Sequence, residues 1–413
     1  MPCRFLTLVL FFLASAWSRA GQVSTLGHEP DWSRLDAFQR TITRDDFLRL
    51  LDSVYAPENA YEEVIKVGTD AALITTSTGA RPLYFAQKKT LPPPRYWKPA
   101  SARKPAAKPL AGVSIALDPG HLGGAWAQME ERWFQMGAGT KPVAEGDMTL
   151  LVARLLAPQL RALGADVTLV RAHAQPVTTL LPKNLHDAAR AELQREDVKL
   201  IRENYDGPAD ALRQNSIQWV SEMLFYRTAE IRRRAQLVNR RLQPDLVVCL
   251  HFNAEDWGDP ARPTFVEKNH LHVLIHGSYS KAELALDDER FGMLVKLLNG
   301  SHAEELSASI PVASSLARAT GLPPYEYTNG KATRTGENTY VWMRNLLANR
   351  LYACPVVYLE PYVMNCEAVW KRVQLGDYEG EREVDGRMRK SIYREYADAV
   401  AEGLANYYRA ARR

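Results

Sequence analysis

IALDPGHLGG, residues 115–124, decides the fold of this 413-residue chain. A short apolar run at residues 113–117 is followed by the turn-forming residues Asp-Pro-Gly and then by His121. Such a run is typical of a buried strand that breaks into a turn. Ligands of open α/β sheets bind beyond the carboxyl ends of the strands. The stretch therefore predicts a sheet strand that presents the imidazole of His121 at a ligand-binding edge.

Two later strands are predicted to end in the same way. The run DLVVCL is followed by His251, and the run VVYL is followed by Glu360. Because the carboxyl ends of parallel strands meet at one edge of a sheet, we expect these side chains and His121 to converge on one metal site. Glu145, which begins a helix in VAEGDMTL, is the best third ligand. An acid in the first turn of a helix is also favourable without a metal.

The order of the predicted elements indicates an α/β fold. Further strands are expected at residues 167–170 and 272–275, and helices at residues 145–163, 215–242, 290–310 and 392–409. Strands that alternate with helices predict a mainly parallel, twisted sheet with helices on both of its faces.

The chain divides into four predicted segments. Residues 1–20 have a positive start, a short apolar core and small residues before position 21, which is typical of a secretory signal peptide. Residues 21–88 form a small N-terminal α+β accessory module, and residues 89–110 form a linker rich in Pro, Lys and Ala. Residues 111–413 form the catalytic domain, with a polar insertion at residues 184–216.

The signal segment predicts a periplasmic or secreted protein without stable membrane insertion after cleavage, because its apolar core is too short to span a bilayer. An uncleaved membrane anchor is the alternative. Cleavage removes Arg4 and Arg19, so the net charge falls from +4 to 4 − 2 = +2. This charge is too small to indicate a nucleic-acid partner.

Three cysteines follow the signal segment, and an odd number does not predict a disulfide scaffold. Cys354 and Cys366 flank the strand of Glu360 and can pair in an oxidising compartment. Cys249 lies inside an apolar strand and is expected to be a small buried hydrophobic residue.

A second group of histidines offers a rival metal site. His270, His272 and His276 share one face of a strand, but the six residue steps from first to last span about 20 Å. One ion cannot hold all three, so we expect a polar strand face near the site. Asp118 is expected to hold its turn or to orient the neighbouring histidine, and Asn253 to shape the loop after its strand.

Four blocks of the chain resemble the zinc-dependent N-acetylmuramoyl-L-alanine amidases, in the order found in that family: LDPGHLGG, AEGDMTLLVARLLAPQLRALGADVTLVR, LVNRRLQPDLVVCLHFNAE and CPVVYLEPYVMN. The resemblance implies that His121, Glu145 and His251 bind zinc and that Glu360 is the catalytic glutamate. It also implies the reaction, which is hydrolysis of the amide between the lactyl group of N-acetylmuramic acid and L-alanine in peptidoglycan.

The sequence departs from this family around the site. The first histidine and the metal-binding glutamate are 145 − 121 = 24 positions apart, which is longer than usual for the family. The loop between them carries Trp126, Trp133 and Phe134, which can line a substrate groove. Gly146 stands where the family commonly has lysine, and Pro361 follows the catalytic glutamate where a glycine-containing segment is usual.

These departures leave several alternatives open. The chain can hydrolyse another amide or peptide with zinc, or it can be a non-catalytic relative that binds the cell wall. The insertion at residues 184–216 is either a lid or autoinhibitory segment over the zinc or a surface decoration. The sequence names no regulatory protein partner.

Overall fold

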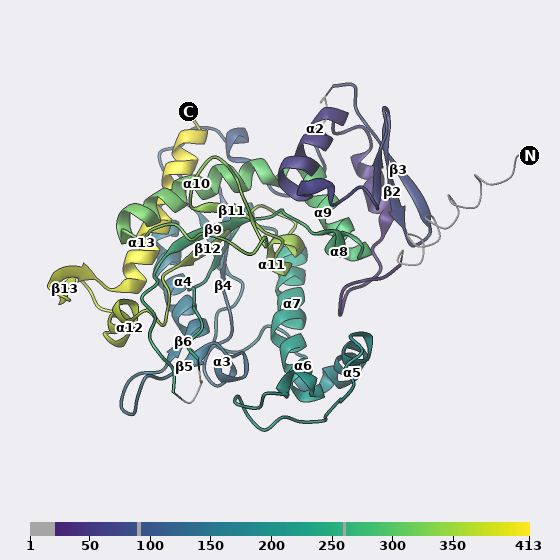
Figure 1. Ribbon diagram of the computed structural model, residues 1–413. Helices are drawn as coiled ribbons and strands as arrows, with labels where there is room; N and C mark the ends of the chain where they lie inside the picture. The colour runs from purple at the N-terminus through teal and green to yellow at the C-terminus, as the bar shows by residue number, and fades with distance from the viewer. Residues whose placement is uncertain (1–20, 89–91, 259–261) are drawn as a thin grey trace, which may run out of the picture.

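The computed structural model describes residues 21–88, 92–258 and 262–413 (Figure 1). The predicted signal segment at residues 1–20 therefore lies outside the described residues. Within the described residues, no helix combines the length and the apolar character that crossing a membrane requires.

A seven-stranded sheet forms the centre of the chain, in the order β10-β11-β9-β12-β8-β4-β7. Its strands are β4 (Ser114–Pro119), β7 (Asp166–Leu169), β8 (Leu246–Leu250), β9 (Leu271–Ile275), β10 (Thr333–Arg334), β11 (Val341–Met343) and β12 (Val356–Pro361). Strands β7, β4, β8 and β12 are mutually parallel, and β11 is parallel to β9. β9 pairs antiparallel with β12, and β10 with β11. The prediction of a mainly parallel sheet is confirmed.

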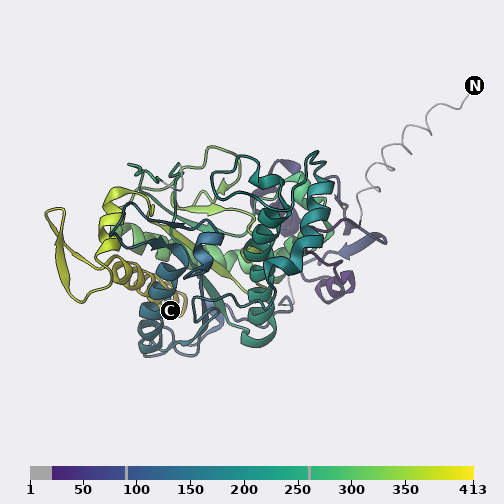
Figure 2. The ribbon, with the colours of Figure 1, turned by 90° about the horizontal axis from the view of Figure 1, so that it is seen from below.

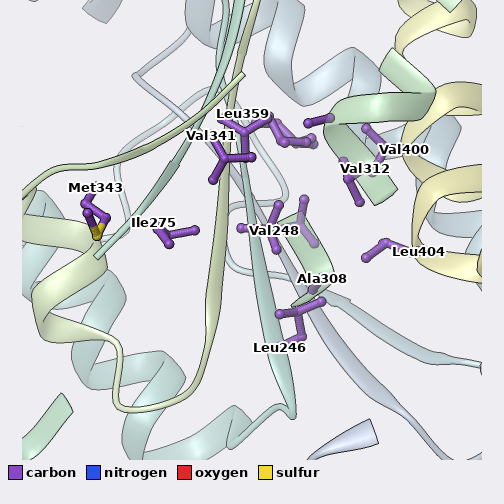
Figure 3. Close-up of a cluster of buried hydrophobic side chains, with 14 of the residues drawn as sticks. Leu246, Val248, Ile275, Ala308, Val312, Val341, Met343, Leu359, Val400 and Leu404 are labelled. Atoms are coloured by element: carbon purple, nitrogen blue, oxygen red, sulfur yellow. The ribbon is translucent and has the colours of Figure 1, made fainter. Parts of the chain in front are cut away.

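Helices cover both faces of this sheet, as predicted. On one face lie α4 (Glu145–Ala162), α10 (Ser301–Thr320) and α13 (Ile392–Ala411). There, Val248 and Leu359 of the strands meet Val312 and Leu404 of the helices in a buried apolar cluster (Figure 3). Alternate strand residues such as Cys249, which is buried as expected, face α7 (Glu230–Leu237) and α11 (Leu347–Leu351) on the other side.

Two predicted helices differ from the structure in detail. The helix expected at residues 290–310 is two helices, because Gly300 adopts φ +73° and ends α9 (Asp287–Asn299) before α10 begins. Glycine takes this left-handed conformation without the steric cost of a side chain. The helix expected at residues 215–242 contains α6 (Ile217–Leu224) and α7, interrupted by a π-helical turn at Phe225–Ala229.

The N-terminal module is α+β, as predicted, and contains a three-stranded antiparallel sheet and a helix. It consists of α2 (Arg44–Leu50), β1 (Ile65–Val67), β2 (Ala71–Thr76) and β3 (Gly79–Tyr84). Its hydrophobic residues join the core of the larger sheet. Trp32, for example, meets Phe291 of α9 edge to face, with ring centroids 5.4 Å apart. The module therefore packs directly against the rest of the chain (Figure 1).

The predicted linker also contacts the core. Trp97 and Ala100 are buried, and the backbone N–H of Ala100 donates to the Glu304 carboxylate at 2.8 Å. The insertion contains α5 (His186–Arg195), which packs on α6 through Ala189 and Leu193. The segment boundaries themselves stay predictions.

The remaining elements lie at the periphery of the sheet. They are α3 (Trp126–Met129), the short hairpin of β5 (Trp133–Phe134) and β6 (Val143–Ala144), α8 (Lys281–Leu284), α12 (Glu367–Gln374), and the hairpin of β13 (Glu381–Val384) and β14 (Arg387–Lys390). Figure 2 shows this last hairpin projecting away from the body of the molecule. Cys249, Cys354 and Cys366 are all free, so the possible Cys354–Cys366 disulfide is not formed.

Candidate metal centre

Three side chains predicted as metal ligands meet at one point. One ligand atom each from His121, Glu145 and His251 lies within 4.8 Å of the others, which is the metal-ligand spacing expected of one ion. His121 Nε2 is 3.3 Å from Glu145 Oε2, and His251 Nδ1 is 3.2 Å from Glu145 Oε1. The two imidazole rings stand nearly perpendicular, with centroids 4.9 Å apart. Residues up to 130 positions apart in the chain thus form one cluster.

The turn after β4 that carries His121 is held by a buried arginine. Arg234 of α7 donates to the carbonyl oxygens of Pro119 at 2.8 Å and His121 at 3.1 Å. It also donates to Asp118 Oδ1 at 2.9 Å, and Asp118 Oδ2 accepts from the hydroxyl of Tyr352. Asp118 therefore acts on the turn through Arg234, which is the first of the two roles expected for it.

The orienting partner of His121 is Glu130, which the sequence reasoning missed. His121 Nδ1 is 2.7 Å from Glu130 Oε1, and the backbone N–H of Leu122 donates to Oε2 at 2.7 Å. Glu130 is buried, and this burial raises the pKa of its carboxyl to about 7. A carboxylate behind a metal-binding histidine fixes the ring and its tautomer. The loop between the first two ligands thus supplies a supporting residue for the site.

Two glycines let the cluster close. A Cβ atom added to Gly120 would lie 2.1 Å from Cε1 of His251, so only glycine allows that ring to approach the turn. A Cβ atom at Gly146 would lie 2.1 Å from the carbonyl oxygen of Leu122. The conformation of the loop after His121 therefore explains why a larger residue is absent after Glu145.

Burial and neighbouring charges together set the charge states of the ligands. Burial lowers the pKa of His121 well below its usual value, which leaves the ring neutral as metal binding requires. Burial opposes the charge of Glu145, but His121, His251 and Arg132 outweigh it and hold the pKa of Glu145 below its usual value. Glu145 Oε2 has no hydrogen-bond partner within the described residues. Two imidazole nitrogens and a charged carboxylate oxygen that forms no hydrogen bond within the described residues fit the ligand set of a catalytic zinc site.

Glu360, at the end of β12, lines the same cavity of about 310 Å³ as His121 and Glu145. Burial, together with the charge of Glu145, raises the pKa of Glu360 to about 7, although His251, Arg132 and Arg344 oppose this rise. In the part of the chain that the structure describes, Glu360 forms no ion pair. The carboxyl group can therefore hold or release a proton near neutral pH beside the metal cluster.

The rival histidines do not form a metal site within the described residues. The rings of His270 and His272 are 6.1 Å apart, and His270 Nε2 lies 3.3 Å from Glu255. His276 is buried with its Nε2 3.0 Å from the hydroxyl of Tyr279. His272 nevertheless lines the site cavity. Asn253 also lines it and accepts the N–H of Ala254 through its own side chain, so that it shapes the loop after His251 as expected.

Of the three aromatic residues in the loop before Glu145, Trp133 lines two cavities. Trp126 packs on Phe225 with ring centroids 5.3 Å apart, and Phe134 is buried. The cavity beside Trp133 measures about 630 Å³ and shares Arg132 with the metal-site cavity. The insertion contributes Pro208, Ala209 and Arg213 to this adjoining cavity.

No protein-family model matches the chain, and no curated protein matches its sequence. Solved structures of N-acetylmuramoyl-L-alanine amidases do align with it. Ami1 from Mycobacterium smegmatis is 17% identical, with 73% of this chain and 99% of that chain covered at a TM-score of 0.37. The CwlD amidase from Clostridioides difficile, solved in complex with the GerS lipoprotein, is 14% identical. The alignment covers 72% of this chain and 98% of that chain, at a TM-score of 0.37. AmiC2 of Nostoc punctiforme is 13% identical, with 72% of this chain and 98% of that chain covered at a TM-score of 0.37.

Proposed function

We propose that this chain is a zinc-dependent hydrolase of the amide between N-acetylmuramic acid and L-alanine in peptidoglycan. The observation that carries the proposal is the shared cavity of His121, Glu145 and Glu360, with His251 completing the ligand cluster. The four sequence blocks that resemble the zinc amidases contain these same four residues. An ion held by three protein ligands keeps a position open for the reaction.

The reaction requires a nucleophile at neutral pH and a group that moves protons. When bound, zinc polarises a carbonyl group and lowers the pKa of water to about 7. Glu360 takes the proton of the attacking water and delivers it to the leaving amine. Its pKa of about 7 suits both halves of this transfer, because the carboxyl group can gain and lose a proton at neutral pH.

We also propose that the protein acts outside the cytoplasm, where peptidoglycan is found. The support is the signal-like composition of residues 1–20.

Zinc content and the cleaved bond, measured on the purified protein with isolated sacculi, test the proposed function. We expect one zinc per chain and release of stem peptides with a free L-alanine amino group. The Glu360→Gln variant should keep zinc and lose about 100-fold or more of the rate, whereas His121→Ala should lose zinc. Glu367→Gln, on the exposed start of α12, is the matched control.

Three outcomes contradict the proposal in different ways. Zinc without peptide release favours another amide substrate. Wall binding without hydrolysis of any amide favours a non-catalytic binding protein. Full activity in Glu360→Gln removes the role assigned to that carboxyl group.

A further inference from the structure

Part of the site cavity is formed by the chain from the end of α10 to Arg344, the residue after β11. This segment contributes Tyr325, Tyr327, Asn329, Lys331 and Arg344 to the lining. None of these residues belongs to the metal cluster. They give the cavity a wall with two cationic side chains and two aromatic rings, which the proposed hydrolysis does not use.

Arg344 is held in place without an acidic partner. Its Nη1 donates to the hydroxyl of Tyr327 at 3.4 Å, and its guanidinium carbon lies 5.7 Å from the centroid of that ring. The same hydroxyl is 3.1 Å from Nε2 of His272. Burial lowers the pKa of His272 to about 3, so this imidazole is neutral and adds no charge. Contacts with Tyr327 thus fix the position of the guanidinium and do not neutralise its charge.

Four acids line the cavity, and one of them, Glu360, feels the charge of Arg344, which lowers the pKa of Glu360 against the effect of burial. The other three are engaged elsewhere. Glu145 belongs to the metal cluster and lies 3.8 Å from Arg132. Glu255 is 3.3 Å from His270 and 3.5 Å from Lys268.

Asp256, the next acid of the lining, accepts the backbone N–H of Gly258 at 2.9 Å. Neither Arg344 nor the exposed Lys331 forms an ion pair with any residue that the structure describes. A half-buried cation that forms no ion pair within the described residues can pair with an anion that arrives from outside the protein.

We propose that Arg344 binds a carboxylate of the substrate, with Lys331 at the exposed rim adding to the attraction. This inference rests on the proposed function and specifies its substrate class: N-acyl peptides with a free carboxylate close to the scissile amide. A guanidinium group matches a carboxylate with two parallel hydrogen bonds. Within the described residues the other guanidinium nitrogens form no hydrogen bond, so they can make this pairing.

A matched pair of substrates tests the inference on the full-length, zinc-loaded protein. One is muramoyl-L-alanyl-D-glutamate with both carboxyl groups free, and the other is the same compound with both converted to carboxamides. We expect kcat/KM to be about tenfold or more higher for the free acid, as the loss of a charged hydrogen bond implies. Arg344→Gln should abolish this preference, mainly by raising KM for the free acid, and Arg344→Lys should retain part of it.

Arg334→Gln is the matched control. Arg334 is an exposed arginine of β10 that pairs with Glu326, and it does not line the site cavity. This variant should keep the preference for the free acid. A second readout is binding of the same two compounds to zinc-loaded Glu360→Gln, measured by calorimetry. This measurement does not depend on turnover, and it should show the same preference.

The results separate this inference from the proposed function. Equal kcat/KM for the two compounds in the wild type overturns the carboxylate assignment while the amidase function stands. An equal loss on both compounds in Arg344→Gln also overturns it, because the arginine then acts on the structure or on Glu360. If neither compound is hydrolysed, the amidase proposal fails, and the calorimetric preference alone decides the role of Arg344.

Discussion

Replacing Glu130 by glutamine should weaken zinc binding although Glu130 is not a ligand. The carboxylate accepts two buried hydrogen bonds, from His121 Nδ1 and from the N–H of Leu122, each at 2.7 Å. Because His121 Nε2 faces Glu145, Nδ1 carries the proton and donates. A carboxamide has one acceptor oxygen, so its NH₂ group must face one of these two donors. One charged hydrogen bond is lost, at about 1.5–3 kcal/mol, which corresponds to about 10- to 100-fold in zinc affinity.

Competition with a chromophoric chelator at neutral pH measures this change. Glu131→Gln is the matched control, because the neighbouring carboxylate pairs with Arg213 at 3.3 Å and is 35% exposed. We expect the control to bind zinc as the wild type does. A folded Glu130→Gln protein whose zinc affinity stays within about twofold of the wild type would show that Glu130 does not support the metal site.

Three further perturbations test other parts of the structure. Gly120→Ala should lose zinc, because the new Cβ would lie 2.1 Å from the His251 ring; Gly137→Ala, which meets open space, should keep it by metal analysis. In chelator-treated protein, the raised pKa of Glu360 means that the folded state holds its proton more tightly than the unfolded chain, so stability falls as pH rises from about 4.5 to 7. Urea titrations across this pH range should find a smaller fall in the free energy of unfolding for Glu360→Gln than for the wild type. The difference should be at most about 3 kcal/mol. Lys296→Met should destabilise the protein by about 3–5 kcal/mol, because Lys296 and Glu305 form a fully buried ion pair at 2.5 Å. The control Lys371→Met removes an exposed ion pair and should have a much smaller effect on stability. A loss below about 1 kcal/mol in Lys296→Met would contradict the prediction.

Five of the seven strands of the central sheet and the four principal site residues could be predicted because each depends on local sequence, whereas the short β10 and β11 were not predicted. Apolar runs mark the strands, and His251 and Glu360 follow directly from two of them. The strand predicted at residues 113–117 is observed as Ser114–Pro119, and the helix predicted to begin at Glu145 begins there. Parallel neighbours place their carboxyl ends together, so convergence of these residues followed from the predicted sheet.

The supporting residues could not be predicted because their roles depend on contacts distant in sequence. Glu130 lies in the long loop before Glu145, where no periodic pattern distinguishes it from its neighbour Glu131. Arg234 is the third of three consecutive arginines on a helix. It is buried because it meets Asp118 and the turn of His121, whereas Arg233 next to it is exposed. From the sequence alone, Glu130 and Glu131 both look like loop residues, and Arg233 and Arg234 both look like helix residues.

The aromatic and cationic lining of the site cavity depends on the direction of β9. A parallel β9 would place its carboxyl end at the metal edge, but β9 runs antiparallel to β12 and its amino end lies there instead. His272 is consequently paired with Glu360 across the two strands. The backbone of Tyr325 then donates to the carbonyl of Leu271, which brings the segment after α10 to the same edge. Reversal of β9 therefore supplies the aromatic and cationic lining that a uniformly parallel sheet would lack, and a substrate must fit between this lining and the metal ligands.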